Sequence, residues 1–414
     1  MKSAGRTPPP ALGALLLIGS AVLIGSGSMP LFTIHDKGYY AYPDLINFVR
    51  PGLVLKILSA DIAADGAIRA VFRLTDPRGL PLDREGITTP GSVSISFIAA
   101  SIPKGETQYR AYTTRVQTSP ITRASAIQPS GDTGGSFAKV SDGDYTYTFG
   151  TRAPSGYHRT ATHSIGAYAT RDLREFDLDR NFDNDVFSFV PDGSRVAVVR
   201  DVVRTATCNQ KCHDPLALHG GPRRKVELCV LCHQPQNIDP DTGNTVDLAV
   251  MVHKIHMGEE LPSVLAGKRY QIVGNQQNVF DFSEVVFPAG IRNCEVCHDP
   301  KAGAAQSNAW LKPNRAACGS CHDNVNFATG AGHVDLPQVS DSLCSNCHIP
   351  EGELEFDASV KGAHLDPRFS RDLPGTVFDI LSVADGAAGR RPRVTGISSS
   401  SREPRRESRF GTQA

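Results

Sequence analysis

All ten cysteines of this 414-residue chain lie between Cys208 and Cys347, and each pair is followed at once by a histidine. The pairs form five clusters, numbered here in chain order: Cys208/Cys212/His213, Cys229/Cys232/His233, Cys294/Cys297/His298, Cys318/Cys321/His322 and Cys344/Cys347/His348. Four have the spacing C-x-x-C-H, which is the attachment motif of c-type haem. Two thiols add to the haem vinyl groups, and the adjacent histidine binds iron. The sequence therefore predicts five covalent haem c groups.

Other uses of paired cysteines explain this pattern less well. A zinc site would combine two C-x-x-C pairs and would not need a histidine after every second cysteine. Disulfides suit an exported chain but leave the histidines without a role, and redox dithiols normally occur singly. The first cluster is the least regular, because it has one extra residue between its cysteines.

Spare histidines are candidates for the second axial ligand of each iron. Five of the eight histidines outside the clusters lie within or after the cluster region, namely His219, His253, His256, His333 and His364. We expect these five to ligate iron, with His163 as the reserve candidate. Methionine is the rival ligand type, but the chain has only four. A short helix over 247–256 would bring two of these histidines to neighbouring haems.

Five haems within so short a segment must lie close together, which favours electron hopping between them. Iron with two imidazole ligands is coordinatively full, and it has a lower potential than iron with one imidazole and one methionine. We therefore expect an electron carrier rather than a substrate-specific oxidoreductase. Basic side chains available for the haem propionates are Arg223, Arg224, Lys225, Lys254, Lys268, Arg269 and Arg292.

The flanking segments must position the clusters. Residues 45–200 alternate apolar and polar side chains with period two, as in 93–97 and 145–149, and turn signals separate the runs. This predicts an antiparallel β sandwich or split barrel. Residues 201–373 should form a loop-rich, mostly helical pentahaem domain, so the fold class is α+β multidomain.

Acidic residues at the end of the β half form a separate motif. Asp177, Asp179, Asp183 and Asp185 lie within nine residues of one another. A calcium loop is one interpretation, but the glycine of an EF-hand loop is missing. We expect a solvated turn.

The two ends of the chain have compositions of their own. Lys2 and Arg6 precede an apolar run over 11–25, which is typical of an export signal over 1–28; an uncleaved anchor is the alternative. Residues 374–382 match residues 51–59 at six of nine positions, as in a second β domain of which 374–397 would be a stub. The Ser/Arg-rich segment 398–414 is expected to be a disordered tail.

Several of these motifs resemble those of the OmcA/MtrC-type outer-surface multihaem cytochromes of metal-reducing bacteria. The similar stretches are 208–221, 252–259, 292–294 and 315–323, within a resemblance that covers about residues 45–385. The resemblance implies two β domains alternating with two pentahaem domains, ten haems in all. It also implies electron transfer across the cell surface to metal oxides, flavins or partner cytochromes. This chain has one β domain, one pentahaem domain and a stub, and it lacks a lipobox cysteine.

The expected protein is an exported cytochrome of the periplasm or outer cell surface, with other redox proteins, metal oxides or flavins as partners. Its zero net charge argues against nucleic acid as a partner. We expect membrane contact only through the signal, an anchor or a partner. One alternative is a multihaem reductase of a small oxyanion, which needs an open haem; another is a subunit of an extracellular cytochrome filament. No C-x-x-C-K motif marks an open haem.

Overall fold

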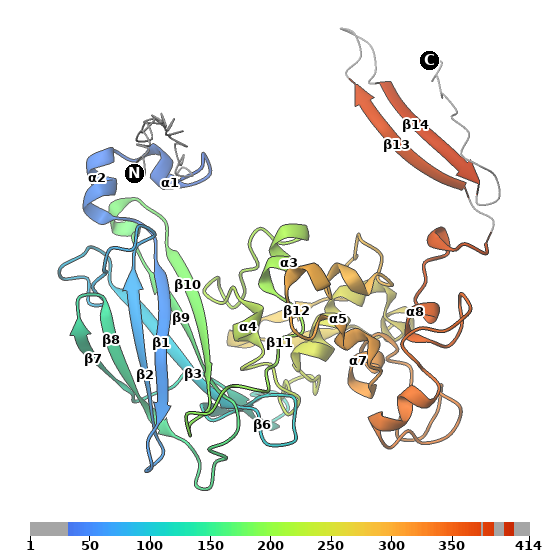
Figure 1. Cartoon of the computed structure of the whole chain (residues 1–414), viewed down its shortest axis with the longest axis horizontal. Helices are drawn as coiled ribbons and strands as arrows, with labels where there is room; N and C mark the ends of the chain where they lie inside the picture. Colours follow the sequence, from blue (N-terminus) through green and yellow to red (C-terminus); the bar gives the residue numbers. More distant parts are fainter. Residues whose placement is uncertain (1–31, 374–375, 385–392, 401–414) are drawn as a thin grey trace, which may run out of the picture.

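The structure is a computed structural model that describes residues 32–373, 376–384 and 393–400 (Figure 1). The expected export signal over 1–28 lies outside the described residues, as does 401–414. Strands dominate the chain as far as Phe189, and short helices and turns follow. Among the residues described, none belongs to a helix with the length and apolar character that crossing a membrane requires.

The N-terminal half contains two antiparallel sheets of four strands each. Their strand orders are β1-β2-β8-β7 and β10-β9-β3-β4, and β5 and β6 form a separate hairpin. The bounds are β1 Val54–Ile62, β2 Ala67–Thr75, β3 Val93–Ser101, β4 Arg110–Ala111, β5 Thr114–Thr118, β6 Ser125–Pro129, β7 Ser136–Ser141, β8 Asp144–Arg152, β9 His163–Arg171 and β10 Asn181–Phe189. The antiparallel β architecture expected for this half is therefore confirmed.

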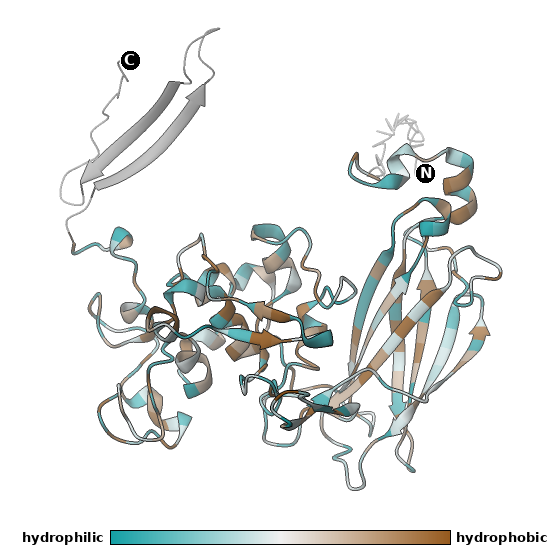
Figure 2. Cartoon of the chain, turned by 180° about the vertical axis from the view of Figure 1, so that it is seen from behind, coloured by the Kyte–Doolittle hydropathy of each residue, from teal (hydrophilic) through white to brown (hydrophobic). Residues whose placement is uncertain are grey.

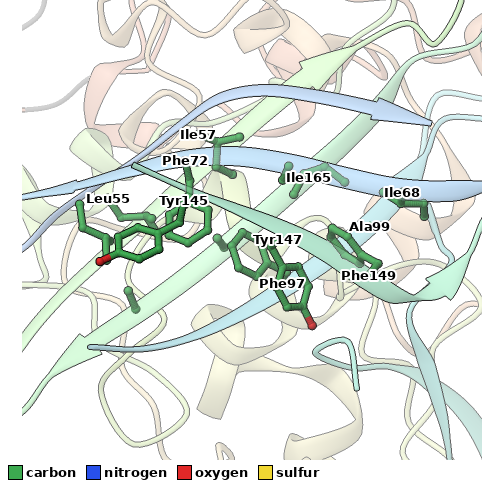
Figure 3. Close-up of a cluster of buried hydrophobic side chains, with 14 of the residues drawn as sticks. Leu55, Ile57, Ile68, Phe72, Phe97, Ala99, Tyr145, Tyr147, Phe149 and Ile165 are labelled. Carbon is green, nitrogen blue, oxygen red and sulfur yellow. The ribbon is translucent and has the colours of Figure 1, made fainter. Parts of the chain in front are cut away.

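Inward-pointing side chains of both sheets form one apolar core (Figure 3). On β2, alternate residues from Ile68 to Leu74 are buried, while those between them are more exposed. Phe97 of β3 stacks on Tyr147 of β8 with ring centroids 4.4 Å apart, which joins the two sheets. The sequence alternation arises because an antiparallel sheet turns one face to the core and the other to solvent.

Acidic side chains of β10 close the edge between the two sheets. β1 and β10 are edge strands of different sheets. The carboxylates of Asp183 and Asp185 accept hydrogen bonds from the backbone N–H groups of Leu55 and Ile57, at 2.8 and 2.7 Å. The expected solvated turn is therefore wrong for this pair of acids, which satisfy donors that an edge strand would otherwise expose. The other two acids of the motif are exposed.

Residues 201–373 fold into short helices connected by turns. The helices of the chain are α1 Lys37–Tyr40, α2 Pro43–Val49, α3 Thr205–Lys211, α4 Val226–Cys229, α5 Leu248–Met257, α6 Pro262–Leu265, α7 Arg315–Cys321 and α8 Val360–Ala363, and β11 Gln271–Val273 pairs with β12 Val279–Asp281. Single-turn 3-10 helices lie between them. Most residues of this half are in turns and loops, and its apolar segments are scattered among polar ones (Figure 2).

The helical half packs on the outer face of the second sheet. Leu228 and Leu231, both almost fully buried, cluster with Ile98 and Ile102 from β3 and the residue that follows it. Gly166 on β9 makes room for them, because a Cβ at this position would lie 2.6 Å from both leucine side chains. The sheet face that would otherwise be solvated is covered by the segment that carries the second cluster.

The C-terminal repeat forms a hairpin of β13 Thr376–Ala384 and β14 Arg393–Ser400. β14 continues into the first residues of the segment that we expected to be a tail. The register of β13 shifts between Ile380 and Ser382, and that of β1 shifts between Ile57 and Ser59. These positions are equivalent in the repeat, so the two copies form the same strand with the same β-bulge.

Candidate haem sites

All five clusters share one backbone hydrogen bond. In each cluster the N–H of the histidine donates to the carbonyl oxygen of the first cysteine, at 2.9–3.0 Å. The first cluster makes this bond from His213 to Cys208 at 2.9 Å, despite its additional residue. The extra residue is accommodated at the end of α3. It does not displace the histidine from the first cysteine.

Cys212 is the predicted haem-binding residue at which the structure differs most from a regular cluster. It is exposed and lies just beyond the end of α3, whereas its partner Cys208 is half-buried within that helix. The longer spacer places Cys212 at the C-cap of α3, where the backbone is no longer helical. Cys318 and Cys347 are exposed too, but their clusters keep the regular spacing.

The thiol of Cys212 nevertheless stays within the group of clusters. It lies close enough to Cys208, and to Cys297 of the third cluster, to raise the pKa of both thiols. Its backbone N–H donates to the carbonyl oxygen of Cys208 at 3.0 Å. Haem attachment at Cys212 stays a prediction, and it rests on this proximity rather than on burial.

Each cluster histidine lies beside one of the five spare histidines. The ring centroids are 6.3 Å apart for His213 and His256, 5.8 Å for His233 and His219, 6.2 Å for His298 and His253, 6.2 Å for His322 and His364, and 6.1 Å for His348 and His333. A metal–imidazole nitrogen bond is about 2.0–2.1 Å long, so imidazoles on opposite sides of one metal have centroids about 6 Å apart. The five separations therefore fit bis-histidine ligation of one iron per pair.

Backbone carbonyl groups orient several of these rings through Nδ1. An Nδ1–H that donates to a carbonyl oxygen leaves Nε2 free to bind a metal. The Nδ1–oxygen distances are 2.8 Å from His233 to Val246, 2.9 Å from His348 to Ala358, 2.9 Å from His256 to Val252 and 2.7 Å from His364 to Val360. These contacts favour the tautomer that iron ligation requires.

The reserve candidate, His163, uses both of its ring nitrogens within the β sandwich. Its Nε2 lies 2.8 Å from the hydroxyl of Tyr112, and its Nδ1 lies 2.9 Å from the carbonyl oxygen of Ala161. The side chain is buried beside Tyr157 and Phe189, and this burial lowers its pKa. His163 is therefore a core residue of β9 with no nitrogen free for iron.

Helix α5 connects three of the clusters. It corresponds to the helix expected over 247–256, and its His253 and His256 lie beside histidines of the third and first clusters. Lys254, between them, forms a largely buried ion pair of 2.5 Å with Asp323, which follows the fourth cluster. The N–H of Ser263 also donates to Asp323 at 2.9 Å. One ten-residue helix thus fixes the positions of several sites relative to one another.

Burial raises the pKa of several cysteine thiols. The pKa of Cys229 is about 12 and that of Cys208 about 11. Reactive cysteines of redox dithiols have lowered pKa values, because nearby positive charges or helix N-termini stabilise the thiolate. In the buried thiols of this chain, burial outweighs the nearby positive charges, such as that of Arg223 on Cys229. The redox-dithiol interpretation is therefore disfavoured.

Thiols of different clusters also lie close enough to raise one another's pKa, which reveals which clusters are neighbours. In addition to the larger effect of burial, the Cys208 thiol raises the pKa of Cys229, and the Cys297 thiol raises the pKa of Cys208. In the same way, the Cys321 thiol raises the pKa of Cys294, and the Cys318 thiol raises the pKa of Cys344. The clusters therefore follow one another in the order second, first, third, fourth, fifth.

Two features of the cysteine/histidine half bear on whether its residues fit haem. Val334, Leu336 and Val339 are 68–75% exposed although they follow directly on His333. The hydroxyl of Tyr270 is buried and finds no hydrogen-bond partner in the part of the chain that is described. A large, mainly apolar group with carboxylate substituents would cover the exposed apolar side chains. One of its carboxylates could accept a hydrogen bond from the Tyr270 hydroxyl. The residues present therefore fit haem.

Most of the basic residues expected to bind propionates already have protein partners. Lys225, Lys254 and Arg269 form ion pairs, Arg223 and Arg224 stack on Tyr168 and Phe182, and Lys268 and Arg292 are exposed. The sequence could not show which of these basic side chains already contact protein groups, because those groups are distant in the chain. Sequence reasoning also missed Arg200, which is discussed below.

A β sandwich joined to a loop-rich segment with five cysteine pairs and five histidine pairs defines a multihaem cytochrome. The comparisons agree. Residues 200–359 match the family of outer membrane cytochrome MtrC/MtrF-like domains II/IV. The chain is 28% identical over 232 residues to multiheme cytochrome MtrC of Shewanella baltica. The aligned region covers 54% of this chain and 30% of the relative.

Two crystal structures show the same fold. The outer membrane decaheme cytochrome OmcA superposes with a TM-score of 0.58 at 22% identity, over 84% of this chain and 53% of OmcA. MtrC from Shewanella baltica superposes with a TM-score of 0.52 at 21% identity, over 80% of this chain and 48% of MtrC. The chain spans about a third of its curated relative and about half of each solved structure. The expected resemblance is confirmed: the chain is similar to the OmcA/MtrC-type multihaem cytochromes, and residues 200–359 match their domains II/IV.

Proposed function

We propose that this chain relays electrons along five covalently bound haems, each held by two cysteines and two histidines. The observation that carries the proposal is the pairing of every cluster histidine with a different spare histidine at 5.8–6.3 Å. Bound haem supplies a reversible one-electron iron couple. Close spacing of the clusters then lets electrons pass between neighbouring sites.

Each residue of a site has a separate role in this proposal. The two cysteines would hold the haem through thioether bonds, and the cluster histidine and the spare histidine would both ligate its iron. The ligand pairs are His213/His256, His233/His219, His298/His253, His322/His364 and His348/His333. The carbonyl groups that accept from Nδ1 of His233, His256, His348 and His364 would keep these four rings in orientation.

The neighbour order of the thiols gives the path. Electrons would pass from the second cluster through the first, third and fourth to the fifth, or in reverse. The second cluster lies against the β sandwich, whereas the fifth lies at the C-terminal side of the described helical half. The two ends of the path therefore face different surroundings, as a relay between two partners requires.

The relatives support an extracellular respiratory role. OmcA is described as an outer membrane decaheme cytochrome. We infer that this chain is exported to the periplasm or outer surface, and that it exchanges electrons with other redox proteins, metal oxides or flavins. The pairing of all five cluster histidines favours this carrier role over reduction of a small oxyanion, because that enzyme needs an iron with a free position.

The decisive experiment is intact-protein mass spectrometry of the mature chain, combined with a pyridine haemochrome assay. We expect five haems per chain. A Cys208→Ala/Cys212→Ala variant should lose one haem and keep four. If the unaltered chain already carries four, the first cluster does not attach haem; if it carries none, the proposed function is wrong.

The exposed thiol of the first cluster needs a test of its own. Cys212→Ala should leave this haem attached through Cys208 alone, because a single thioether bond still holds the macrocycle to the chain. The haemochrome absorption of one haem should then shift, since one vinyl group is no longer saturated. An unchanged spectrum would show that Cys212 forms no thioether bond. Cys232→Ala, in the regular second cluster, provides the matched reference for the shift.

A further inference from the structure

Arg200 is a half-buried cation without a direct hydrogen-bond or ion-pair partner among the described residues. It lies where the β sandwich continues into the cysteine/histidine half, and burial lowers the pKa of its guanidinium. The carboxylate of Asp247 acts on this charge but forms no ion pair with it. Guanidinium donors bind a charged acceptor most strongly, so this position suits an anion.

The backbone fixes Arg200 beside the third cluster. The next residue, Asp201, accepts from the N–H of Gln306 at 2.8 Å and donates its own N–H to the Gln306 side chain at 2.9 Å. Its carboxylate also accepts from the N–H of Ala305 at 2.9 Å. Residues 305 and 306 belong to the loop that follows His298, so the backbone at Arg200 is tied to the segment of the third cluster.

Two charged or titratable groups experience the positive charge of Arg200. One is His298, whose pKa is lowered by burial and, to a smaller extent, by Arg200. The other is Asp247, which precedes α5 and uses its carboxylate to accept from the N–H of Ala249 at 3.4 Å. Arg200 thus lies between the third cluster and the start of the helix that carries His253.

We propose that Arg200 binds a propionate carboxylate of the haem held by His298 and His253, and that its charge raises the reduction potential of that haem. The planar guanidinium suits a carboxylate, which it can bind through two parallel hydrogen bonds. A positive charge near the iron favours the reduced state, because reduction removes one positive charge from the site. The inference rests on the proposed function, since it requires haem at the third cluster.

The test is a spectroelectrochemical titration of the full, haem-loaded chain with Arg200→Gln. One of the five midpoints should fall by about 59 mV, which is a tenfold change in the oxidised-to-reduced ratio of that haem at a fixed applied potential. Arg200→Lys keeps the charge and should restore most of the shift. The matched control is Arg195→Gln, since Arg195 is exposed five residues earlier and should move no midpoint.

A second variant identifies the haem. His253→Met should raise one midpoint, because a methionine ligand favours reduced iron, and it should be the midpoint that Arg200→Gln lowers. Five low-spin haems with unchanged midpoints in Arg200→Gln would overturn the inference and leave the relay intact. A shift in a different haem would overturn the assignment to the third cluster. Absence of haem from the unaltered chain would overturn both proposals.

Discussion

The two halves of this molecule bury apolar surface in different ways. The sandwich fills its own interior: Phe72, Phe97 and Ile165 are at most 1% exposed. In the described cysteine/histidine half, which is of comparable length, only seven hydrophobic side chains are buried, namely Val226, Leu228, Leu231, Val246, Leu261, Tyr270 and Ala304. The difference teaches that one half is stabilised by its own side chains, whereas the other requires a bound group to complete its core.

Preventing haem attachment should have the largest effect, because it tests directly whether the second half folds without a bound group. With all ten cysteines replaced by alanine, we expect the sandwich to stay folded and residues after about 200 to become protease-sensitive. The physical reason is that the helical half loses the group on which its apolar side chains pack. Limited proteolysis with mass analysis of the fragments measures this. Equal resistance of both halves would show that the second half has a sufficient core of its own.

Replacing one histidine in each half should distinguish an iron ligand from a residue that stabilises the sandwich. His364→Ala should convert one haem of five to high spin, because it removes one axial ligand. His163→Ala should leave all five low-spin but cost about 1–3 kcal/mol of sandwich stability, since it leaves the partly buried Tyr112 hydroxyl without its histidine partner. Electron paramagnetic resonance and denaturant unfolding measure the two effects. A high-spin signal from the His163 variant would contradict the ligand pairs proposed above.

Separating the two halves tests how independent the sandwich is. Residues 45–200 alone should be β-rich by circular dichroism, because the main core lies between the two sheets. The truncation uncovers Ile98, Ile102 and Tyr109, which Leu228 and Leu231 cover in the full chain. We therefore expect self-association in analytical ultracentrifugation. A monomeric fragment would mean that this packing contributes little to solubility.

The smallest expected effect concerns pH. Burial lowers the pKa of His163 in the folded state below its ordinary value of about 6.5. Below pH 6.5 the unfolded chain therefore binds a proton that the folded sandwich does not, so the free energy of unfolding falls as the pH decreases. The 45–200 fragment should lose stability as the pH falls below about 6.5. His163→Gln should flatten this dependence in urea titrations; an unchanged slope would assign it to other groups.

Local patterns in the sequence predicted the strands and the cysteine clusters, because both depend on short spacings. They could not predict which histidines lie together. His163 and His364 are equivalent as isolated residues, and only the tertiary fold commits one to Tyr112 and leaves the other beside His322. The exposure of Cys212 could not be predicted either, although its irregular spacing marked the cluster as unusual.

The acidic motif was misinterpreted for the same reason. Asp183 and Asp185 look like part of a solvated turn when only their neighbours in the chain are considered. Their backbone partners on β1 lie 128 residues away. The role of these carboxylates therefore depends on a contact between distant segments, which short-range sequence patterns cannot predict.

The interface at α4 overlaps with a haem-binding motif, and this overlap has a mechanical consequence. Leu228 and Leu231 contact the second sheet, while Cys229 and Cys232, their immediate neighbours, belong to the second cluster. Any displacement of the sheet is therefore transmitted to these two sulfur atoms within a single residue. A force applied to the sandwich, by a docking partner or by adsorption to a mineral, would reach this end of the electron path first and the fifth cluster last.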